Sequence, residues 1–216
     1  MSCQQCCGIA QQFNDHSARK QLKRFRRRGP DKTTRMLVDQ LRRAIEESGT
    51  RGLTLLDIGA GIGAIHHELL NGLVSRATHV DASVGQLAAA REETERRGHT
   101  AAVQFIEGDF IAVAESVPAA DIITLDRVIC CFDDMEQLVR RSAAKTTRFY
   151  GAVYPRDVRW MRIGLGVINL VQKIKRSAFR VFMHDPRAVD SVLKSAGLQP
   201  WSERHTAGWH VVVYRR

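Results

Sequence analysis

The sequence predicts a single α/β domain in which a mostly parallel, doubly wound sheet carries helices on both faces. Two observations favour this fold class. Compact apolar segments alternate along the chain with segments whose apolar residues recur at helical spacing. The chain of 216 residues, 44% hydrophobic and 26% charged, also has the size and composition of one globular domain. In such a sheet, ligands bind beyond the carboxyl ends of the strands.

The elements follow one another in a regular order. Strand character is confined to six short apolar segments, at 53–58 and 76–81, in "VQFIEGDF" (103–110) and "ADIITLDRV" (120–128), and at 148–156 and 209–216. Helical periodicity marks six others, at 19–28, 33–48, 64–73, 84–97, 134–144 and 187–196. Gly49, Gly98 and Gly197 follow three of these helices and are typical helix ends. We expect residues 1–48 to form an N-terminal helical cap and residues 49–216 the main domain, with a lid insertion at about 157–182.

Carboxylates end four successive strands of the predicted sheet. Asp57 and Asp81 end the first two, and Asp109 and Asp126 follow the third and fourth. Each residue alone could be a helix-capping or turn aspartate. Because parallel strands bring their carboxyl ends to one edge, we expect the four side chains to face one cleft.

A glycine-rich turn follows the first strand in "LLDIGAGIGAIHHELL", residues 55–70. With Ala64 it satisfies the pattern of a dinucleotide site, and Asp81 has the spacing expected for a ribose contact. A diphosphate, however, requires backbone N–H groups without a nearby anion, and Asp57 would place a negative charge there. S-adenosylmethionine has no phosphate and carries an ammonium and a sulfonium, so the residues favour this cofactor over NAD.

Each part of S-adenosylmethionine has a candidate partner in these motifs. We expect Asp57 to hold the amino end, the helix N-terminus to take the carboxylate and Asp81 to bind the ribose hydroxyls. Asp109 would accept a hydrogen bond from the adenine amino group, and Phe110 would stack on the ring. The full set of predicted cofactor-binding residues is Asp57, Gly59, Gly61, Gly63, Asp81, Ala82, Asp109, Phe110 and Asp126.

These motifs resemble those of class I S-adenosylmethionine-dependent methyltransferases over roughly residues 53–153, in "LLDIGAGIG", "THVDAS", "IEGDF" and "DIITLDRV". The resemblance implies a Rossmann-like domain with a seven-stranded sheet whose final strand is antiparallel. The flanks, with Phe13 in "FND", "RFRRRGPDKTTRMLVDQL" and "VFMHDPRAVDSVLKSAGL", are similar to the magnesium-protoporphyrin O-methyltransferases and their relatives. That family methylates a carboxylate on a planar tetrapyrrole.

The sequence departs from that family after the fourth strand. A turn resembling histidine–tyrosine–proline, associated there with the active site, is replaced here by "ICCFDDM" at residues 129–135. A thiol does not replace an imidazole that acts as a base near neutral pH. We therefore expect a relative with an altered substrate.

The predicted reaction is transfer of a methyl group to a small molecule, as O-methylation of an acidic or aromatic substrate. A carboxylate acceptor needs no base at pH 7, whereas a phenol or thiol benefits from one. The candidates for such a group are His184, Cys131 and Tyr154, with Cys130 beside them, although His184 could equally be a capping or core residue and the cysteines could be core packing. The predicted substrate-binding residues are Arg127, Arg156 and Trp160.

The segment after the fifth strand, residues 156–176, predicts an amphipathic lid helix. Trp160, Val167, Val171 and Ile174 fall on one helical stripe, flanked by basic residues. We expect the deep part of this stripe to face the core. An apolar wall with a basic rim also suits a flat hydrophobic acid or contact with an anionic membrane surface.

The net charge of +10 includes "RKQLKRFRRR", residues 19–28, with seven basic residues and no acid. This segment is either the solvated face of a helix or an attractor of an anionic partner. It leaves RNA methylation as an alternative, but the fourth-strand motif "LDRV" lacks the turn used on exocyclic amines, so nucleic acid is disfavoured. A cofactor-binding protein without catalysis is the other alternative, and the oligomeric state is left open.

Five cysteines do not suggest a disulfide framework, and the chain shows no signal peptide, so we expect a cytoplasmic protein that could contact a membrane surface peripherally. Cys3, Cys6 and Cys7 could form a zinc site only together with Cys130 and Cys131. His66 and His67, adjacent on a helix, point about 100° apart and cannot share a metal there. We therefore predict no metal site.

Overall fold

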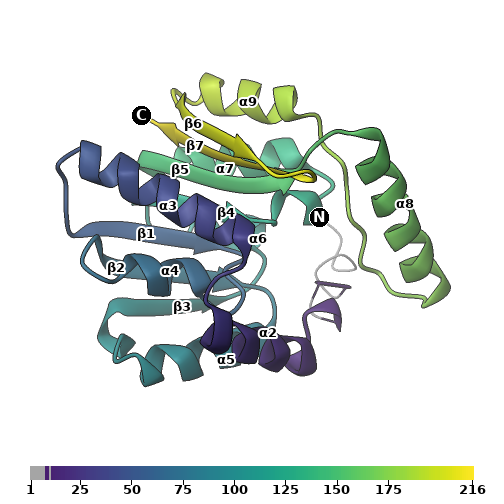
Figure 1. Cartoon of the computed structure of the whole chain (residues 1–216), viewed down its shortest axis with the longest axis horizontal. Helices are drawn as coiled ribbons and strands as arrows, with labels where there is room; N and C mark the ends of the chain where they lie inside the picture. The colour runs from purple at the N-terminus through teal and green to yellow at the C-terminus, as the bar shows by residue number, and fades with distance from the viewer. Residues whose placement is uncertain (1–7, 10) are drawn as a thin grey trace.

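The computed structural model describes residues 8–9 and 11–216 and contains a seven-stranded sheet with the order β3-β2-β1-β4-β5-β7-β6 (Figure 1). Its strands are β1 (Leu53–Ile58), β2 (Val74–Asp81), β3 (Val103–Glu107), β4 (Ala120–Asp126), β5 (Thr146–Pro155), β6 (Gln199–His205) and β7 (Trp209–Arg215). The neighbours from β3 through β5 pair in parallel, and β7 is antiparallel to both β5 and β6. The predicted mostly parallel sheet with an antiparallel final strand is confirmed.

Helices cover both faces of the sheet because its central strands, such as β1 and β4, are apolar on both sides. One hydrophobic cluster joins a face of the sheet to α3 (Lys32–Glu47) and α4 (Ala64–Leu69). A second cluster joins the other face to α6 (Phe110–Val113), α7 (Met135–Ala144) and α9 (Pro186–Ser195). The fully buried side chains of Leu55 and Leu56, which are neighbours on β1, belong to these two different clusters. Because successive side chains of a strand point to opposite faces of the sheet, one strand contributes apolar residues to the core on each face.

Two elements differ from the sequence expectation in extent. The strand β6, "QPWSERH", was not predicted because its residues are mostly exposed and show no apolar alternation. It forms at the edge of the sheet through its pairing with β7, which is a tertiary contact. The helix expected at 64–73 ends as α4 at Leu69, because the chain turns at Gly72 into an earlier start of β2.

The N-terminal helix α2 (Asp15–Arg28) packs against α5 (Val84–Arg96). Its N-cap Asn14 accepts a hydrogen bond from the Ser17 N–H, and Leu22 and Phe25 are buried. Arg26 reaches α5 and donates to the buried Glu93 at 2.8 Å. In contrast, α3 lies on the sheet itself and is part of one of its helical layers.

Helix α8 (Arg159–Ile174) stands at the edge of the molecule, apart from the two helical layers (Figure 1). The expectation that its apolar stripe faces the core is wrong, because Trp160, Val167, Val171 and Ile174 are all exposed. The helix instead uses its opposite side, with Met161 and Gln172 buried. None of the described helices is long and apolar enough to cross a membrane.

Candidate cofactor and substrate site

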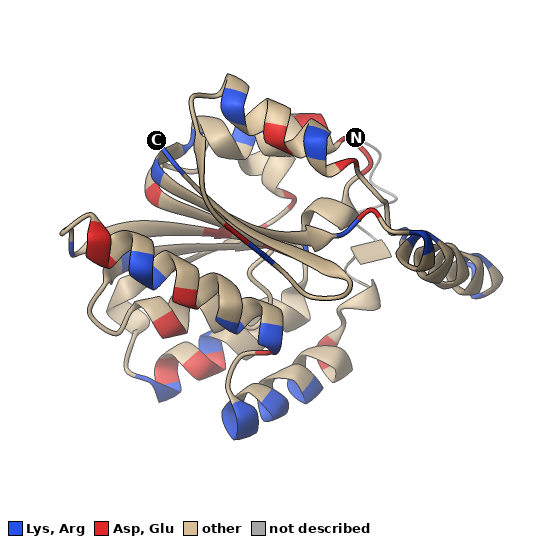
Figure 2. Ribbon diagram, turned by 45° about the horizontal axis from the view of Figure 1, so that its top comes forward, with Lys and Arg blue, Asp and Glu red and all other residues tan. Residues whose placement is uncertain are grey.

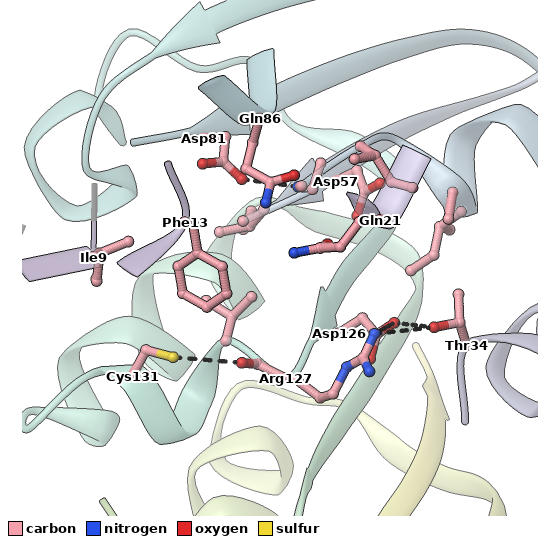
Figure 3. Close-up of a pocket in the computed structure, with 18 of the residues that line it drawn as sticks. Ile9, Phe13, Gln21, Thr34, Asp57, Asp81, Gln86, Asp126, Arg127 and Cys131 are labelled. Carbon is pink, nitrogen blue, oxygen red and sulfur yellow. Dashed lines mark hydrogen bonds and ion pairs between the residues drawn. The ribbon is translucent and has the colours of Figure 1, made fainter. Parts of the chain in front are cut away.

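A cavity of about 490 Å³ opens where the carboxyl ends of β1, β2 and β4 meet. This is the point at which strand order reverses, since β1 leads outward to β2 and the chain later returns to the other side of β1 as β4. In Figure 3, Asp57, Asp81 and Gln86 lie at the top of the cavity and Asp126, Arg127 and Cys131 at the bottom. The volume lies within the range of small-molecule sites.

Asp57 is the most deeply buried of the described carboxylates that line the cavity, with 1% of its surface exposed. One oxygen accepts a hydrogen bond from the Thr124 hydroxyl at 2.7 Å, whereas Oδ2 has no hydrogen-bond partner among the described residues. Burial raises the pKa of Asp57 to about 7. Burial also lowers the pKa of His66, whose Nδ1 lies 3.8 Å from Oδ2, to about 3, so this neighbour is neutral. An unpaired carboxylate facing a cavity is well suited to a cation.

The glycine turn and the end of β2 are joined through Asp81. Its carboxylate accepts from the Gly61 N–H and from the Ser83 N–H, each at 2.8 Å, and burial raises its pKa. At Gly59, with φ of +60°, a Cβ would lie 2.5 Å from Val128 Cγ2, so only glycine fits. The buried Gln86 Oε1 has no hydrogen-bond partner among the described residues and lines the same space. It is therefore available to a donor on a ligand.

The residues after β3 and β2 complete this side of the cavity. Asp109 caps α6 by accepting from the Ile111 N–H at 3.0 Å, and Phe110 is 2% exposed. Both line the cavity together with Ala82. Asp109 therefore has both roles: it caps α6 and it lines the cavity.

At the bottom of the cavity, Asp126 and Arg127 form a charged cluster with residues of the N-terminal part. The Arg127 guanidinium donates to Asp31 Oδ2 at 2.6 Å and lies 3.1 Å from Asp126 Oδ1. Thr34 donates to Asp126 Oδ2. Arg127 also has φ of +63°, a conformation in which few non-glycine residues occur and which is often found at functional sites. Its charge is already balanced by two carboxylates.

Among the predicted cofactor- and substrate-binding residues, three do not line the cavity. Gly63 is required instead because a Cβ there would lie 2.2 Å from the His66 ring. Arg156 donates to the carbonyl oxygens of Thr206 and Ala207 at the turn between β6 and β7, and Trp160 lies over Gly208 in the same turn. The tryptophan in the cavity wall is Trp209.

Of the three candidate catalytic residues, only Cys131 lines the cavity. His184 is not part of the lining, and its Nε2 lies 2.8 Å from the Phe132 carbonyl oxygen. Tyr154 is buried and stacks on His210, and burial raises the pKa of its phenol, which disfavours the phenolate. Cys130 and Cys131 both donate to the Arg127 carbonyl, and the neighbouring Cys131 together with burial raises the pKa of Cys130.

Several cavity residues were not identified from the sequence, namely Ile9, Phe13, Gln21, Arg24, Thr34, Gln86, Leu165, Ile168 and Trp209. Most of them come from the N-terminal segment and α8, which the fold brings over the sheet edge (Figure 1). Their periodicity predicts only which helix face is apolar. No local pattern indicates that α2 closes the cleft over β1.

Four histidines form a cluster beside the site that the sequence also did not suggest. The rings of His66 and His67 have centroids 4.2 Å apart, His79 packs on His66, and His67 Nδ1 lies 3.4 Å from His99 Nδ1. Burial lowers the pKa values of His66, His67 and His79, so these three are neutral side chains. Among the described residues no group of three or more potential ligands has the geometry of a metal site. Cys3, Cys6 and Cys7 lie outside the described residues.

Comparison with known proteins identifies a methyltransferase domain in the chain. Residues 56–146 match the family model described as a methyltransferase domain. The structure is similar to magnesium protoporphyrin IX methyltransferase from Synechocystis PCC 6803 with bound SAH, with a TM-score of 0.73 and 16% identity over 98% of this chain and 99% of that one. None of the curated proteins matches the chain significantly.

Two further solved structures have the same fold. A putative sarcosine dimethylglycine methyltransferase from Galdieria sulphuraria gives a TM-score of 0.65 with 12% identity, over 85% of this chain and 84% of that one. An O-methyltransferase family 2 protein from Planctomyces limnophilus in complex with apigenin gives a TM-score of 0.61 with 17% identity, over 87% of this chain and 62% of that one. Residues 56–146 thus contain a methyltransferase domain, and the described chain has the Rossmann-like fold of S-adenosylmethionine-dependent methyltransferases.

Proposed function

We propose that the protein methylates a carboxylate oxygen of an apolar, planar acid. Two features of the cavity support this. Of the described residues that line it, none is a histidine, lysine or tyrosine, and Asp57, whose pKa burial raises to about 7, would be taken up by the cofactor ammonium, so no base is left for the acceptor. Its wall is rich in aromatic and aliphatic side chains, including Phe13, Phe25, Phe132 and Trp209. A carboxylate is already a nucleophile at pH 7, whereas a phenol or thiol would need deprotonation.

The cofactor would occupy the end of the cavity formed by β1 and β2. Asp57 Oδ2 would take the ammonium, Gln86 Oε1 would accept from a donor on the ligand, and Asp81 would accept from the ribose hydroxyls while holding Gly61. When bound, S-adenosylmethionine supplies an electrophilic methyl group on a positively charged sulfur. The protein aligns the acceptor and excludes water. It therefore accelerates methyl transfer by orienting the reactants and not by transferring a proton.

Arg24 carries the proposal for an acidic substrate. It lines the cavity from α2, is exposed and has no hydrogen-bond or ion-pair partner among the described residues. Arg127, the other described cation in the lining, is held by Asp31 and Asp126. A substrate carboxylate entering the cavity would therefore find its free counter-charge at Arg24.

The activity is tested with methyl-labelled cofactor and a panel of planar carboxylic acids, their phenol and thiol counterparts, a tetrapyrrole and RNA. We expect methyl esters, identified by product mass, from the apolar acids and none from the matched primary amides. Product formed only on phenols or thiols, or methylation of RNA, would contradict the proposal.

The role of Arg24 is tested with the best acid found in that panel. Arg24→Gln should raise KM for the acid roughly five- to tenfold with kcat little changed, because an exposed charge pair contributes about 1 kcal/mol and acts in ground and transition states alike. Arg27→Gln removes the same charge from the same helix outside the cavity and should leave KM within about twofold. Equal effects of the two variants would show a general field effect and not a specific contact.

A further inference from the structure

Helix α8 exposes a continuous apolar surface. Of the eight exposed large hydrophobic side chains in the described part of the chain, seven belong to this helix. Six of them are separated by helical spacing and include Ile163 at 68% and Ile174 at 73% exposed. We call these six the α8 face, which consists of Trp160, Ile163, Val167, Leu170, Val171 and Ile174. At 100° per residue they fall within an arc of about 100° on one side of the helix.

The opposite side of α8 faces the body of the protein and is partly polar. The Asn169 amide bonds both the N–H and the carbonyl oxygen of Val181, at 2.8 and 2.7 Å. The buried Gln172 donates to Gln12 at 2.8 Å. This is the reverse of an ordinary surface helix, which turns its apolar side inward. The outward face is therefore not explained by the packing of the described chain.

Positive charge borders the α8 face. Residues 156–180 contain seven Lys and Arg and a single acid, Asp157, which pairs with Arg162 at 2.6 Å. Arg159, Lys173, Lys175 and Arg176 are exposed and have no ion-pair partner among the described residues. Figure 2 shows basic residues on α8 at the right of the molecule. A second copy of the chain would bring the same positive border against this one, which opposes self-association through this face.

We propose that the α8 face docks on an anionic membrane surface. An interfacial helix inserts its apolar side to the level of the acyl chains and places Lys and Arg at the headgroups, and both requirements are met here by one element. Leu165 and Ile168 of the same helix line the cavity, so docking would hold one wall of the substrate site against the bilayer.

The test is sedimentation of the full chain with vesicles, and it needs neither cofactor nor substrate, so its outcome is independent of the proposed reaction. Wild type should bind vesicles of phosphatidylcholine with phosphatidylglycerol and bind phosphatidylcholine alone at least tenfold more weakly. The double variant Ile163→Ser, Val167→Ser should lose at least tenfold in binding to the anionic vesicles. Val84→Ser, which removes an exposed apolar side chain on α5, should not change it.

Two further experiments test the role of the positive charge and the insertion of Trp160. Lys173→Gln with Lys175→Gln should weaken binding to the anionic vesicles, whereas Arg51→Gln with Arg76→Gln, an equal loss of exposed charge elsewhere, should not. A blue shift of tryptophan fluorescence on binding should persist in Trp201→Phe and disappear in Trp160→Phe. Wild type that binds no vesicles, binding that survives the α8 face variants, or a dimer that these variants dissociate would each overturn the proposal.

Discussion

Asp57 illustrates how burial prepares a single side chain for a cation. Its carboxylate is enclosed, accepts a hydrogen bond from Thr124 and lies beside a neutral His66. Its pKa of about 7 means that the empty site holds this residue about half protonated at neutral pH. The proposed ammonium partner would stabilise the charged form and lower the pKa, so binding should release a proton below this pH.

The pH dependence of cofactor affinity follows from this shift. Because the protonated carboxyl cannot pair with a cation, affinity for S-adenosylmethionine should fall roughly tenfold from pH 7 to pH 5.5, since each pH unit below the pKa of the empty site costs up to a factor of ten. Calorimetric titrations at several pH values measure this directly. Asp57→Asn keeps the acceptor for Thr124 but cannot ionise, so its affinity should be weaker and nearly constant with pH. If the affinity of this variant changed with pH as steeply as that of the wild type, a group other than Asp57 would be responsible for the pH dependence.

At the scale of elements, the attachment of α2 to α5 shapes the site, because α2 contributes Gln21, Arg24 and Phe25 to the cavity. Glu93 is central to this attachment. Its side chain is fully buried and pairs with Arg26, Arg96 and Arg97 at 2.6 to 2.8 Å, which lowers its pKa. Part of the basic segment at 19–28 therefore has a structural function, although its other cations remain exposed.

Replacing Glu93 by Gln should lower the free energy of unfolding by about 2 kcal/mol, because three guanidinium groups lose a shared and partly desolvated partner. Urea unfolding monitored by circular dichroism measures the change. Glu92→Gln is the matched control, since its side chain is 61% exposed and pairs with Arg26, and it should change stability by less than about 0.5 kcal/mol. Equal losses in the two variants would indicate that burial of Glu93 adds nothing.

The elements also show what could be predicted from sequence and why the rest could not. Strands such as β1 and β4 are apolar on both sides, and their ends carry Asp57 and Asp126, so composition and position indicated both the sheet and the cleft. The edge strand β6 depends on pairing with β7, and the contributions of Phe13, Arg24 and Gln86 depend on how helices close over the sheet. The outward orientation of α8 contradicts the usual rule for amphipathic helices. Local patterns do not contain these tertiary contacts.

At the scale of the whole molecule, one edge of a doubly wound sheet gathers carboxylates on a protein whose net charge is +10. The cofactor end of the cavity contains Asp57, Asp81 and Asp109, whereas Arg24 and the α8 border present positive charge toward the outside. This division of charge suits a cationic cofactor held deep in the fold and an acidic substrate that approaches from the surface.

The choice of a sulfonium cofactor over a dinucleotide is the central claim, and calorimetry of the wild-type chain with S-adenosylmethionine and with NAD under identical conditions tests it most directly. S-adenosylmethionine should give a saturable heat with a single site per chain, and NAD should give none, because Asp57 would face its diphosphate. Tight binding of NAD together with no heat from S-adenosylmethionine would contradict the account.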